Sequence, residues 1–307
     1  MTDAPRFSIV MAAFNAAATV RSAIGSVLAQ TNPDLELIVV DDGSTDGTAE
    51  ALASVPDPRV RAISQPNRGP AAARNAGIAE ARGGYVAFLD SDDLLMPTYL
   101  ERSERALRES GGAGFAYTDA YVFDAATGKV RRRSAMARNR PPEPPPTDPA
   151  AFLLELLQRN FIYVATTVPR KVLEHVGGFD ESLKGPEDYE LWLRILVRGY
   201  GAAWMPGRQA LYRKHGSQLS RNVVTMTRSL LAVYDGLSME DMPSVEHRRL
   251  LERRRRETRR QLVVLSRFGR LVPVGLVGRL KAAGVGESWY DAGPPEVTAA
   301  FPDLSAV

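Results

Sequence analysis

The sequence lacks several features that define common protein classes. Its 307 residues include no cysteine, which excludes disulfides, thiolate metal sites and cysteine nucleophiles. No apolar run approaches the roughly 18 residues of a membrane-spanning helix. Neither the G-x-G-x-x-G turn nor the G-x-x-x-x-G-K-[ST] loop occurs, so the two common phosphate-binding sequences are missing. A bound metal would therefore rely on oxygen or histidine, and a phosphate would be held by other means.

The positive charge of the chain is concentrated in one segment. The net charge is only +3, but twelve basic and three acidic residues fall between Ser244 and Lys281. Residues 245–281 either rest on an anionic membrane surface or pack on the domain or on a second subunit, as in a homodimer. No aromatic interleaving accompanies the arginines, so we expect no nucleic acid partner. We expect a cytoplasmic protein, with peripheral contact at the inner face of the plasma membrane as the alternative that this segment allows.

Three aspartates follow one short apolar run. Residues 85–89 predict a strand buried on both faces, and Asp90, Asp92 and Asp93 come directly after it. Two carboxylates about 4 Å apart repel by roughly 4 kcal/mol at an effective dielectric near 20, so the cluster needs a proton, a basic partner or a cation. An isolated Asp-x-Asp often only caps a helix or lines a turn. A magnesium-type site, with one or two carboxylates and substrate phosphates as ligands, is the functional alternative.

The first half of the chain alternates strands and helices. We expect strands over 7–11, 35–40, 60–63 and 85–89, with helices over 17–30 and 70–82 and a short one ending near 54. This order is typical of βαβ units, which build an α/β fold with a doubly wound, mostly parallel sheet and helices on both faces. Ligands of such sheets bind beyond the carboxyl ends of the strands, where Asp41 and Asp42 form a second acidic cluster.

The second half adds further elements and two more polar groups. We expect helices over 97–110, 151–160, 225–237 and 245–268, strands over 115–123 and 162–168, and a proline-rich loop over 129–149. Pro186 can open a helix with Glu187 and Asp188 in its first turn, where acids either compensate the helix dipole or serve a site. His215, close to Arg213, suits a phosphate or metal site, although a lone histidine is usually structural.

The expected organisation is a catalytic domain followed by an extension. Residues 1–222 form the domain, with a nucleotide-binding half over 1–112 and an acceptor-side half over 113–222. Residues 223–307 form a mainly helical, basic C-terminal extension.

Six stretches, taken in their order along the chain, resemble the GT-A-fold glycosyltransferases of family 2. They span about residues 7–220 and read Ala13-Phe14-Asn15, Asp41-Asp42-Gly-Ser-Thr-Asp-Gly-Thr48, Asn67-Arg68-Gly69-Pro70 through Arg74-Asn75-Ala76-Gly77, Phe88-Leu89-Asp90-Ser91-Asp92-Asp93, Gly178-Phe179-Asp180, and Glu187-Asp188-Tyr189-Glu190-Leu191-Trp192. One departure is Ala12, where many relatives carry proline, and this should alter the turn more than the chemistry.

The resemblance implies an enzyme that moves a sugar, with inversion, from a nucleotide diphosphate to a hydroxyl. The implied donor is a nucleotide sugar, with UDP preferred, and the cofactor is Mn²⁺ or Mg²⁺. The acceptor is a carbohydrate, a lipid-linked molecule or a small molecule, as in polysaccharide, glycolipid or glycoside biosynthesis.

The resemblance also implies roles for individual residues. Nucleotide or donor contacts are expected from Ala13, Phe14, Asn15, Asp41, Asp42, Arg74, Asp90 and Ser91. Asp92, with Asp90 and His215, is expected to hold the metal, and Arg213 to close with His215 over the diphosphate. Asp188 is the expected general base.

Two other functions remain open. A sugar-1-phosphate nucleotidyltransferase shares the nucleotide fold, but residues 12–18 lack its Gly-rich, basic loop. A catalytically silent nucleotide-sugar-binding subunit is disfavoured because both Asp92 and Asp188 are present.

Overall fold

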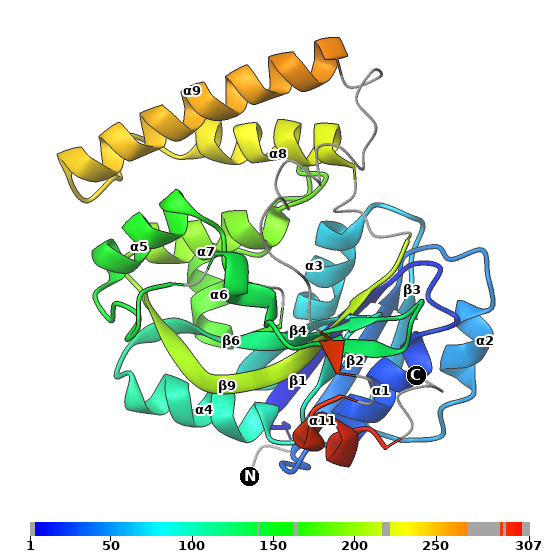
Figure 1. Ribbon diagram of the computed structural model, residues 1–307. Coiled ribbons are helices and arrows are strands. Elements are labelled where there is room, and N and C mark those ends of the chain that lie inside the picture. The colour runs from blue at the N-terminus through cyan, green and yellow to red at the C-terminus, as the bar shows by residue number, and fades with distance from the viewer. Residues whose placement is uncertain are drawn as a thin grey trace.

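The computed structural model describes residues 4–139, 141–162, 165–216, 222–268, 289–290 and 293–302. Within them the chain builds a single mixed sheet with helices on both faces (Figure 1). The main path through the sheet is β10-β7-β6-β8-β4-β1-β2-β3, with β9 pairing with β6 and β5 pairing with β9.

The first half of the chain forms the parallel part of the sheet. Its elements are β1 (Phe7–Ala13), α1 (Val20–Leu28), β2 (Leu35–Asp41), α2 (Thr48–Ala53), β3 (Val60–Ser64), α3 (Pro70–Glu80) and β4 (Tyr85–Asp90). Strand β1 runs parallel to β2 and β4, and β3 runs parallel to β2. Every residue of β2 is buried, as expected for a strand covered on both faces. The predicted α/β sheet is confirmed here.

The second half mixes strand directions. Its elements are β5 (Leu94–Leu95), α4 (Tyr99–Glu109), β6 (Ala113–Asp124), β7 (Lys129–Arg131), the 3₁₀ helix η1 (Ala135–Arg138), α5 (Pro149–Gln158), β8 (Thr166–Pro169), α6 (Arg170–Val176), α7 (Glu187–Val197) and β9 (Gly201–Lys214). Strand β8 is antiparallel to both β4 and β6, whereas β9 is parallel to β6. The strand predicted over 162–168 begins only at Thr166, and the predicted loop over 129–149 contains β7 and η1.

Alternate residues of each inner strand supply two hydrophobic cores. Val10 and Ile38 point into a core that also receives side chains from α3, α5 and α7. Ile9 and Leu37 point to the other face, where α1 and α4 cover them. Because successive strand residues face opposite sides of a sheet, this alternation fixes the register of the strands. The sheet therefore holds its loops on a rigid base.

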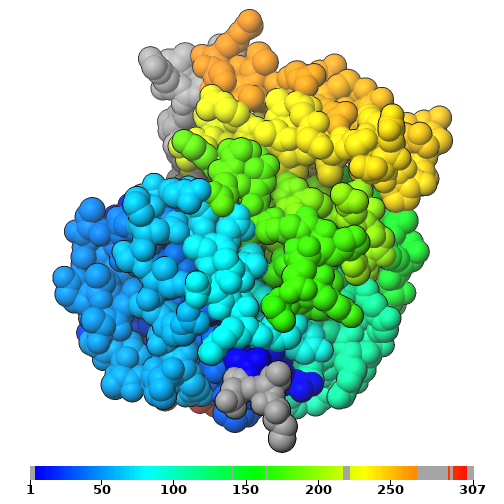
Figure 2. Space-filling view, turned by 180° about the vertical axis from the view of Figure 1, so that it is seen from behind, coloured from blue at the N-terminus to red at the C-terminus, as the bar shows by residue number. Residues whose placement is uncertain are grey.

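The C-terminal elements are α8 (Val223–Gly236), α9 (Val245–Phe268), β10 (Trp289–Tyr290) and α11 (Pro295–Ala300). Helices α8 and α9, both predicted, lie across one end of the body (Figures 1 and 2). Tyr234 and Leu251 from these helices belong to the same core as α7, so α8 and α9 are packed on the body. Strand β10 pairs with β7. Residues 269–281 of the predicted basic segment lie outside the described residues. Among the helices described, none is long and apolar enough to cross a bilayer.

Candidate active site

The polar clusters predicted from the sequence meet at the carboxyl ends of β1, β2 and β4. Ala13 is the register partner of Asp41, and Ala12 that of Asp90. Three loops therefore leave the same edge of the sheet side by side. This is the edge at which parallel α/β sheets bind their ligands.

The loop after β1 is fastened to the loop after β2. Asn15 has a positive φ of 50°, its N–H donates to Ser44 Oγ at 2.9 Å, and its Oδ1 accepts from the Thr45 N–H at 2.9 Å. The neighbouring Phe14 ring is 51% exposed. Because a large apolar side chain gains by leaving water, Phe14 offers a surface for a flat apolar group such as a base. Ala13 is buried and contributes only its backbone to this edge.

The two aspartates at the end of β2 have different partners. The carboxylate of Asp42 accepts three hydrogen bonds, from Gln65 Nε2 at 2.7 Å and from the backbone N–H groups of Arg68 at 2.9 Å and Gly69 at 2.8 Å. Asp41 accepts through Oδ1 from one backbone N–H of the next turn, at 3.0 Å. Its Oδ2 has no hydrogen-bond partner among the described residues. Asp41 therefore keeps one oxygen open to a ligand, whereas the oxygens of Asp42 hold the 65–69 loop.

Three carboxylates gather after β4. One oxygen each from Asp90, Asp92 and Asp93 lies within 4.8 Å of the others. Nε2 of His215 lies 2.7 Å from Oδ2 of Asp92. Burial and the neighbouring carboxylates raise the pKa of Asp93 well above its usual value, and burial raises that of Asp90 against the opposing effect of Arg74. A divalent cation would relieve this repulsion with oxygen ligands, so the residues fit a Mg²⁺ or Mn²⁺ site.

Arg213 lies behind this acidic turn and is 3% exposed. Its backbone N–H donates to Asp93 Oδ1 at 2.8 Å, and its Nε donates to the Asp92 carbonyl at 2.7 Å. Nη2 donates to Ser22 Oγ at 3.1 Å. These contacts shape the turn that presents the aspartates, and closure over a diphosphate stays a prediction. Ser91, also on this turn, is buried.

Arg74 joins the acidic turn to α7. Its Nη2 donates to Asp90 Oδ1 at 2.7 Å and its Nη1 to Glu187 Oε1 at 2.5 Å. The Phe179 ring lies 5.3 Å from the guanidinium carbon, within the range of a cation–π contact. Although burial opposes it, the two carboxylates raise the pKa of Arg74. The sequence placed Arg74 at the nucleotide, and the structure shows its cationic group bridging two carboxylates of the site.

The adjacent acids of α7 have separate environments. Glu187 is 6% exposed and is paired with Arg74. Among the described residues, the Tyr189 N–H is the one hydrogen-bond donor to the Asp188 carboxylate, at 2.7 Å. Burial, and then the charge of Glu187, raise the pKa of Asp188 to about 7 against the opposing effect of Arg74. A carboxylate with a pKa near neutral pH is suited to accept a proton.

Asn75 is a positioning group to which the sequence assigned no role. Its Oδ1 accepts from the Phe179 N–H at 2.8 Å, and its Nδ2 donates to the Phe179 carbonyl at 2.9 Å. A Cβ added at Gly178 would lie 2.3 Å from this Oδ1. The amide thus holds the loop that sets Phe179 on Arg74. Asn75, Gly178 and Phe179 were visible as motif members, but their contact joins residues about a hundred positions apart.

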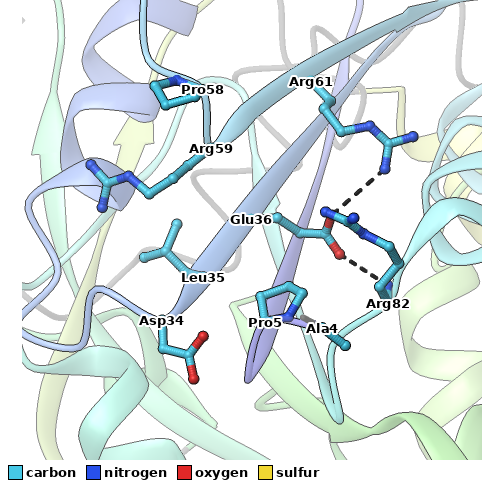
Figure 3. A pocket seen from close by; sticks show the side chains of 9 residues that line it. All are labelled: Ala4, Pro5, Asp34, Leu35, Glu36, Pro58, Arg59, Arg61 and Arg82. Atoms are coloured by element: carbon cyan, nitrogen blue, oxygen red, sulfur yellow. Dashed lines mark hydrogen bonds and ion pairs between the residues drawn. The ribbon is translucent and has the colours of Figure 1, made fainter. Parts of the chain in front are cut away.

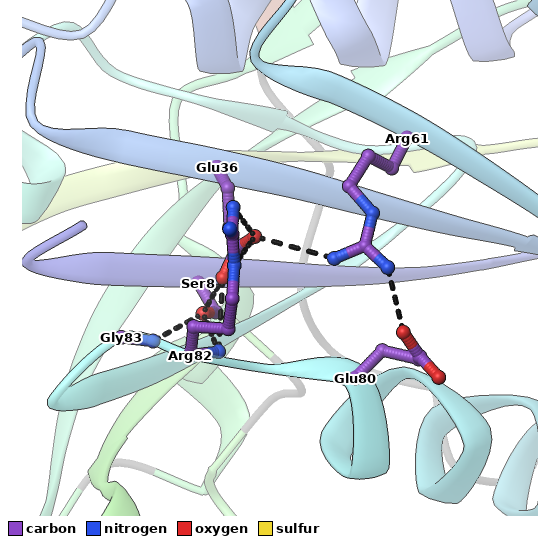
Figure 4. A network of polar contacts seen from close by, with 6 residues as sticks. All are labelled: Ser8, Glu36, Arg61, Glu80, Arg82 and Gly83. Carbon is purple, nitrogen blue, oxygen red and sulfur yellow. Dashed lines mark hydrogen bonds and ion pairs between the residues drawn. The ribbon is translucent and has the colours of Figure 1, made fainter. Parts of the chain in front are cut away.

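The opposite, amino-terminal edge of the sheet carries a different polar cluster (Figures 3 and 4). A cavity of about 460 Å³ is lined there by Arg59, Arg61, Arg82 and Glu36, among others. Glu36 accepts from Ser8 Oγ at 2.7 Å and from Nη2 of Arg82 at 2.8 Å. Hydrogen bonds from Arg82 and Ser8 outweigh the effect of burial and lower the pKa of Glu36. Glu36 is paired with both Arg61 and Arg82, so the cluster holds this edge of the sheet together.

Comparison with known proteins places this architecture. The sequence model described as "Glycosyl transferase family 2" matches residues 8–177. The succinoglycan biosynthesis protein ExoO of Rhizobium meliloti (strain 1021) is 36% identical over 295 residues, which cover 91% of this chain and 81% of ExoO. An Escherichia coli enzyme, the UDP-Glc:alpha-D-GlcNAc-diphosphoundecaprenol beta-1,3-glucosyltransferase WfaP, is 29% identical over 218 residues, covering 70% and 80% of the two chains.

Solved structures share the fold. TarS 1–349 of S. aureus in complex with UDP-GlcNAc aligns with a TM-score of 0.66 at 15% identity, covering 97% of this chain and 80% of that one. The mannosyltransferase PcManGT from Pyrobaculum calidifontis, in complex with GDP-Man and Mn²⁺, aligns with a TM-score of 0.56 at 18% identity, covering 99% and 86%.

The fold and the matched motifs define a glycosyltransferase of the GT-A type. Within that class, the chain belongs to glycosyl transferase family 2. The resemblance drawn from the sequence is thereby confirmed.

Proposed function

We propose that this enzyme transfers a sugar, with inversion, from a nucleoside diphosphate donor to an acceptor hydroxyl in one displacement. The observation that carries the proposal is the separation of the two acids of α7. Glu187 is engaged by the buried Arg74, whereas Asp188 has a pKa of about 7 and a nearly unengaged carboxylate. One acid is left to accept a proton beside an acidic cluster that suits a cation.

The proposed step needs one base. Asp188 accepts the proton of the acceptor hydroxyl while that oxygen bonds to the anomeric carbon, and the bond from this carbon to the diphosphate oxygen breaks with its electron pair leaving on the diphosphate. A divalent cation, when bound to Asp92 with Asp90 and His215, supplies positive charge that stabilises the diphosphate. No second carboxylic acid is required, in contrast to the carboxyl pair of glycosidases.

We propose a UDP-sugar as the donor. The uridine nucleotides in the names of WfaP and of the TarS complex support this choice, while the GDP-Man complex of PcManGT keeps guanosine as the rival. Phe14 and the open oxygen of Asp41 would hold the base. The 65–69 loop, held by Asp42, would border the same pocket.

We propose a lipid-linked carbohydrate as the acceptor, in the assembly of a polysaccharide. The proposal rests on the names of two relatives, since ExoO acts in succinoglycan biosynthesis and WfaP on a diphosphoundecaprenol-linked sugar. Transfer at the cytoplasmic face of a membrane would follow from such an acceptor.

A thermal-shift series tests the donor site. Wild-type protein is heated with UDP, GDP, dTDP or CDP, each with and without Mn²⁺. A ligand at a hundred times its dissociation constant stabilises the fold by roughly 2.7 kcal/mol, and we expect this shift for UDP with the metal. Asp92→Asn should lose the metal-dependent part of the shift. The matched control Asp57→Asn, at an aspartate paired with Arg59 away from the site, should keep it.

The same series, combined with a transfer assay, distinguishes the proposed enzyme from a silent binding subunit. A shift without any sugar transfer in a screen of UDP-sugars and acceptors would favour a silent binding subunit. The absence of a shift with every nucleotide would contradict the proposal.

A further inference from the structure

Helix α9 has one buried and one open face. His247, Leu250, Leu251 and Thr258 are buried against the body. The helix forms the outermost layer at its end of the molecule, where it packs on α8 and, through His247, on Ala150 of α5 (Figures 1 and 2). The opposite face of α9 therefore looks away from the catalytic body.

That open face carries a row of arginines, which we call the arginine stripe. Its members follow helical spacings of three, four and seven residues and are Arg249, Arg253, Arg256, Arg260 and Arg267. Val263 and Val264 lie between the last two and are 48% and 56% exposed, among the most exposed large apolar side chains described. Apolar side chains thus sit within a strongly cationic face.

The stripe is poorly neutralised by its own chain. Arg253 and Arg256 approach Glu257 and Glu252 only to 3.8 and 3.6 Å. For Arg249, Arg260 and Arg267, the described residues provide no acidic partner. Surface pairs at such distances contribute little. The face keeps a net positive charge that a partner with negative charge would balance.

We propose that the arginine stripe docks α9 on the surface of an anionic phospholipid bilayer. Each basic residue near such a surface strengthens binding about fivefold. The two valines can enter the boundary between headgroups and acyl chains while the arginines reach the phosphates. Charge complementarity and the paired valines together select a lipid surface.

Other occupants fit the stripe less well. A second copy related by a twofold axis would set one row of arginines against the other, and like charges repel. Binding of single-stranded nucleic acid generally adds aromatic stacking groups, and the sequence from Val245 to Arg267 contains no Phe, Tyr or Trp. An anionic bilayer needs neither self-complementarity nor base contacts.

Docking through α9 would also orient the active site. Tyr189, next to Asp188, has its hydroxyl 3.5 Å from that of Tyr234 in α8, and Arg254 Nε donates to the Tyr234 hydroxyl at 3.3 Å. This chain of contacts joins α9 to the helix of the proposed base. Presentation of a lipid-linked acceptor rests on the proposed function, whereas bilayer binding does not.

Vesicle sedimentation tests the docking. The full-length protein is mixed, at about 0.15 M salt, with vesicles of phosphatidylcholine containing about 30% phosphatidylglycerol, or of phosphatidylcholine alone. We expect wild type to sediment with the anionic vesicles only. The triple variant Arg249→Glu, Arg260→Glu, Arg267→Glu should bind at least tenfold more weakly, since three attractive charges are replaced by repulsive ones.

A matched triple variant controls for net charge. Arg108→Glu, Lys171→Glu and Arg198→Glu change exposed basic residues on α4, α6 and the end of α7, and this variant should sediment as wild type. The nucleotide-induced thermal shift should be the same in all three proteins, which checks folding independently of lipid. Equal sedimentation of the stripe variant and wild type, equal binding to neutral vesicles, or binding to random duplex DNA without binding to vesicles would overturn the proposal.

Discussion

The two edges of the central sheet hold buried carboxylates in opposite electrostatic states. At the amino edge, Glu36 accepts from Ser8 and Arg82 and lies 3.6 Å from Arg61, and its pKa is lowered. At the carboxyl edge, the pKa values of Asp93 and Asp188 are raised. Glu36 and Asp93 are both buried at edges of the same sheet, so the difference between them lies in the supply of positive charge and of hydrogen-bond donors.

This difference indicates what each edge is for. Donors and cations satisfy the acid at the amino edge, so removing its charge leaves them without their partner and destabilises the fold. At the carboxyl edge, Arg74 serves both Asp90 and Glu187, and the remaining acids are left with excess negative charge. Groups with strongly shifted pKa values gather at functional sites because their charge is completed by a substrate or an ion. Substitutions should therefore reduce activity at one edge and stability at the other.

The largest effect is expected for Asp188→Asn. Amide nitrogen cannot accept the hydroxyl proton, so kcat should fall by about 10²–10⁴, with nucleotide binding retained. Glu190→Gln, two positions along α7 where the acid pairs with Arg194, is the matched control and should keep most activity. Initial rates with the identified donor provide the measurement. Normal turnover by Asp188→Asn would remove this residue from the mechanism.

The pH dependence of Asp188 gives a second measurement on the same variant. The base must be ionised, so wild-type kcat should rise about tenfold per pH unit below its pKa of about 7 and level off above it. The stability of the fold has the opposite pH dependence, because the pKa of Asp188 in the folded protein lies above its usual 3.8. The contribution of Asp188 to the free energy of unfolding is therefore fully present below about pH 4 and is lost as the pH rises through 7. Asp188→Asn should therefore stabilise the fold at pH 8 and change little near pH 4.

At the amino edge, Glu36→Gln should reduce stability instead. The amide keeps one acceptor but leaves buried donors without a charged partner, at a cost of about 2 kcal/mol in the free energy of unfolding. The pKa of Glu36 is lowered in the fold, so its contribution is present above its usual 4.5 and is lost as the pH falls through the folded value.

Denaturant unfolding at pH 7 and in acid measures this effect. The penalty should be full at pH 7 and shrink in acid, which is the reverse of Asp188→Asn. Glu80→Gln, at the half-exposed acid that pairs with Arg61, should cost less than about 0.5 kcal/mol. A large loss of kcat in folded Glu36→Gln protein would contradict the view that the amino edge serves stability and not activity.

The sequence predicted the elements that depend on local pattern. The apolar run before Asp90 and the proline before Glu187 each sit within a few residues of the acids that they present, so both elements and their acidic ends could be anticipated. The direction of the strands after β4 could not be predicted, because an apolar run has the same pattern in a parallel and in an antiparallel strand. Strand β8 is far from β4 in the sequence, and it pairs with β4 in the antiparallel direction.

The roles of adjacent acids depended on distant residues. Arg74 and Glu187 are 113 positions apart, and their pairing decides that Glu187 is engaged while Asp188 is not. In the same way, the 65–69 loop takes the oxygens of Asp42 and leaves Asp41 open. Motif order locates such pairs, but only tertiary contacts show which member has a free oxygen.

Asp41 and Asp42 repeat the contrast between the two edges within one dipeptide, and they carry the smallest expected effect. Asp41→Asn replaces the open Oδ2 with a donor, so affinity for the nucleotide base should fall about tenfold, as expected for one hydrogen bond to a charged group. The midpoint of thermal unfolding without ligand should hardly change. Asp42→Asn should instead lower that midpoint, because the Gln65, Arg68 and Gly69 donors lose a charged acceptor. Calorimetric titration of both variants with the nucleotide measures these affinities. If Asp42→Asn lost affinity at unchanged stability while Asp41→Asn kept its affinity, the base contact would belong to Asp42 instead of Asp41.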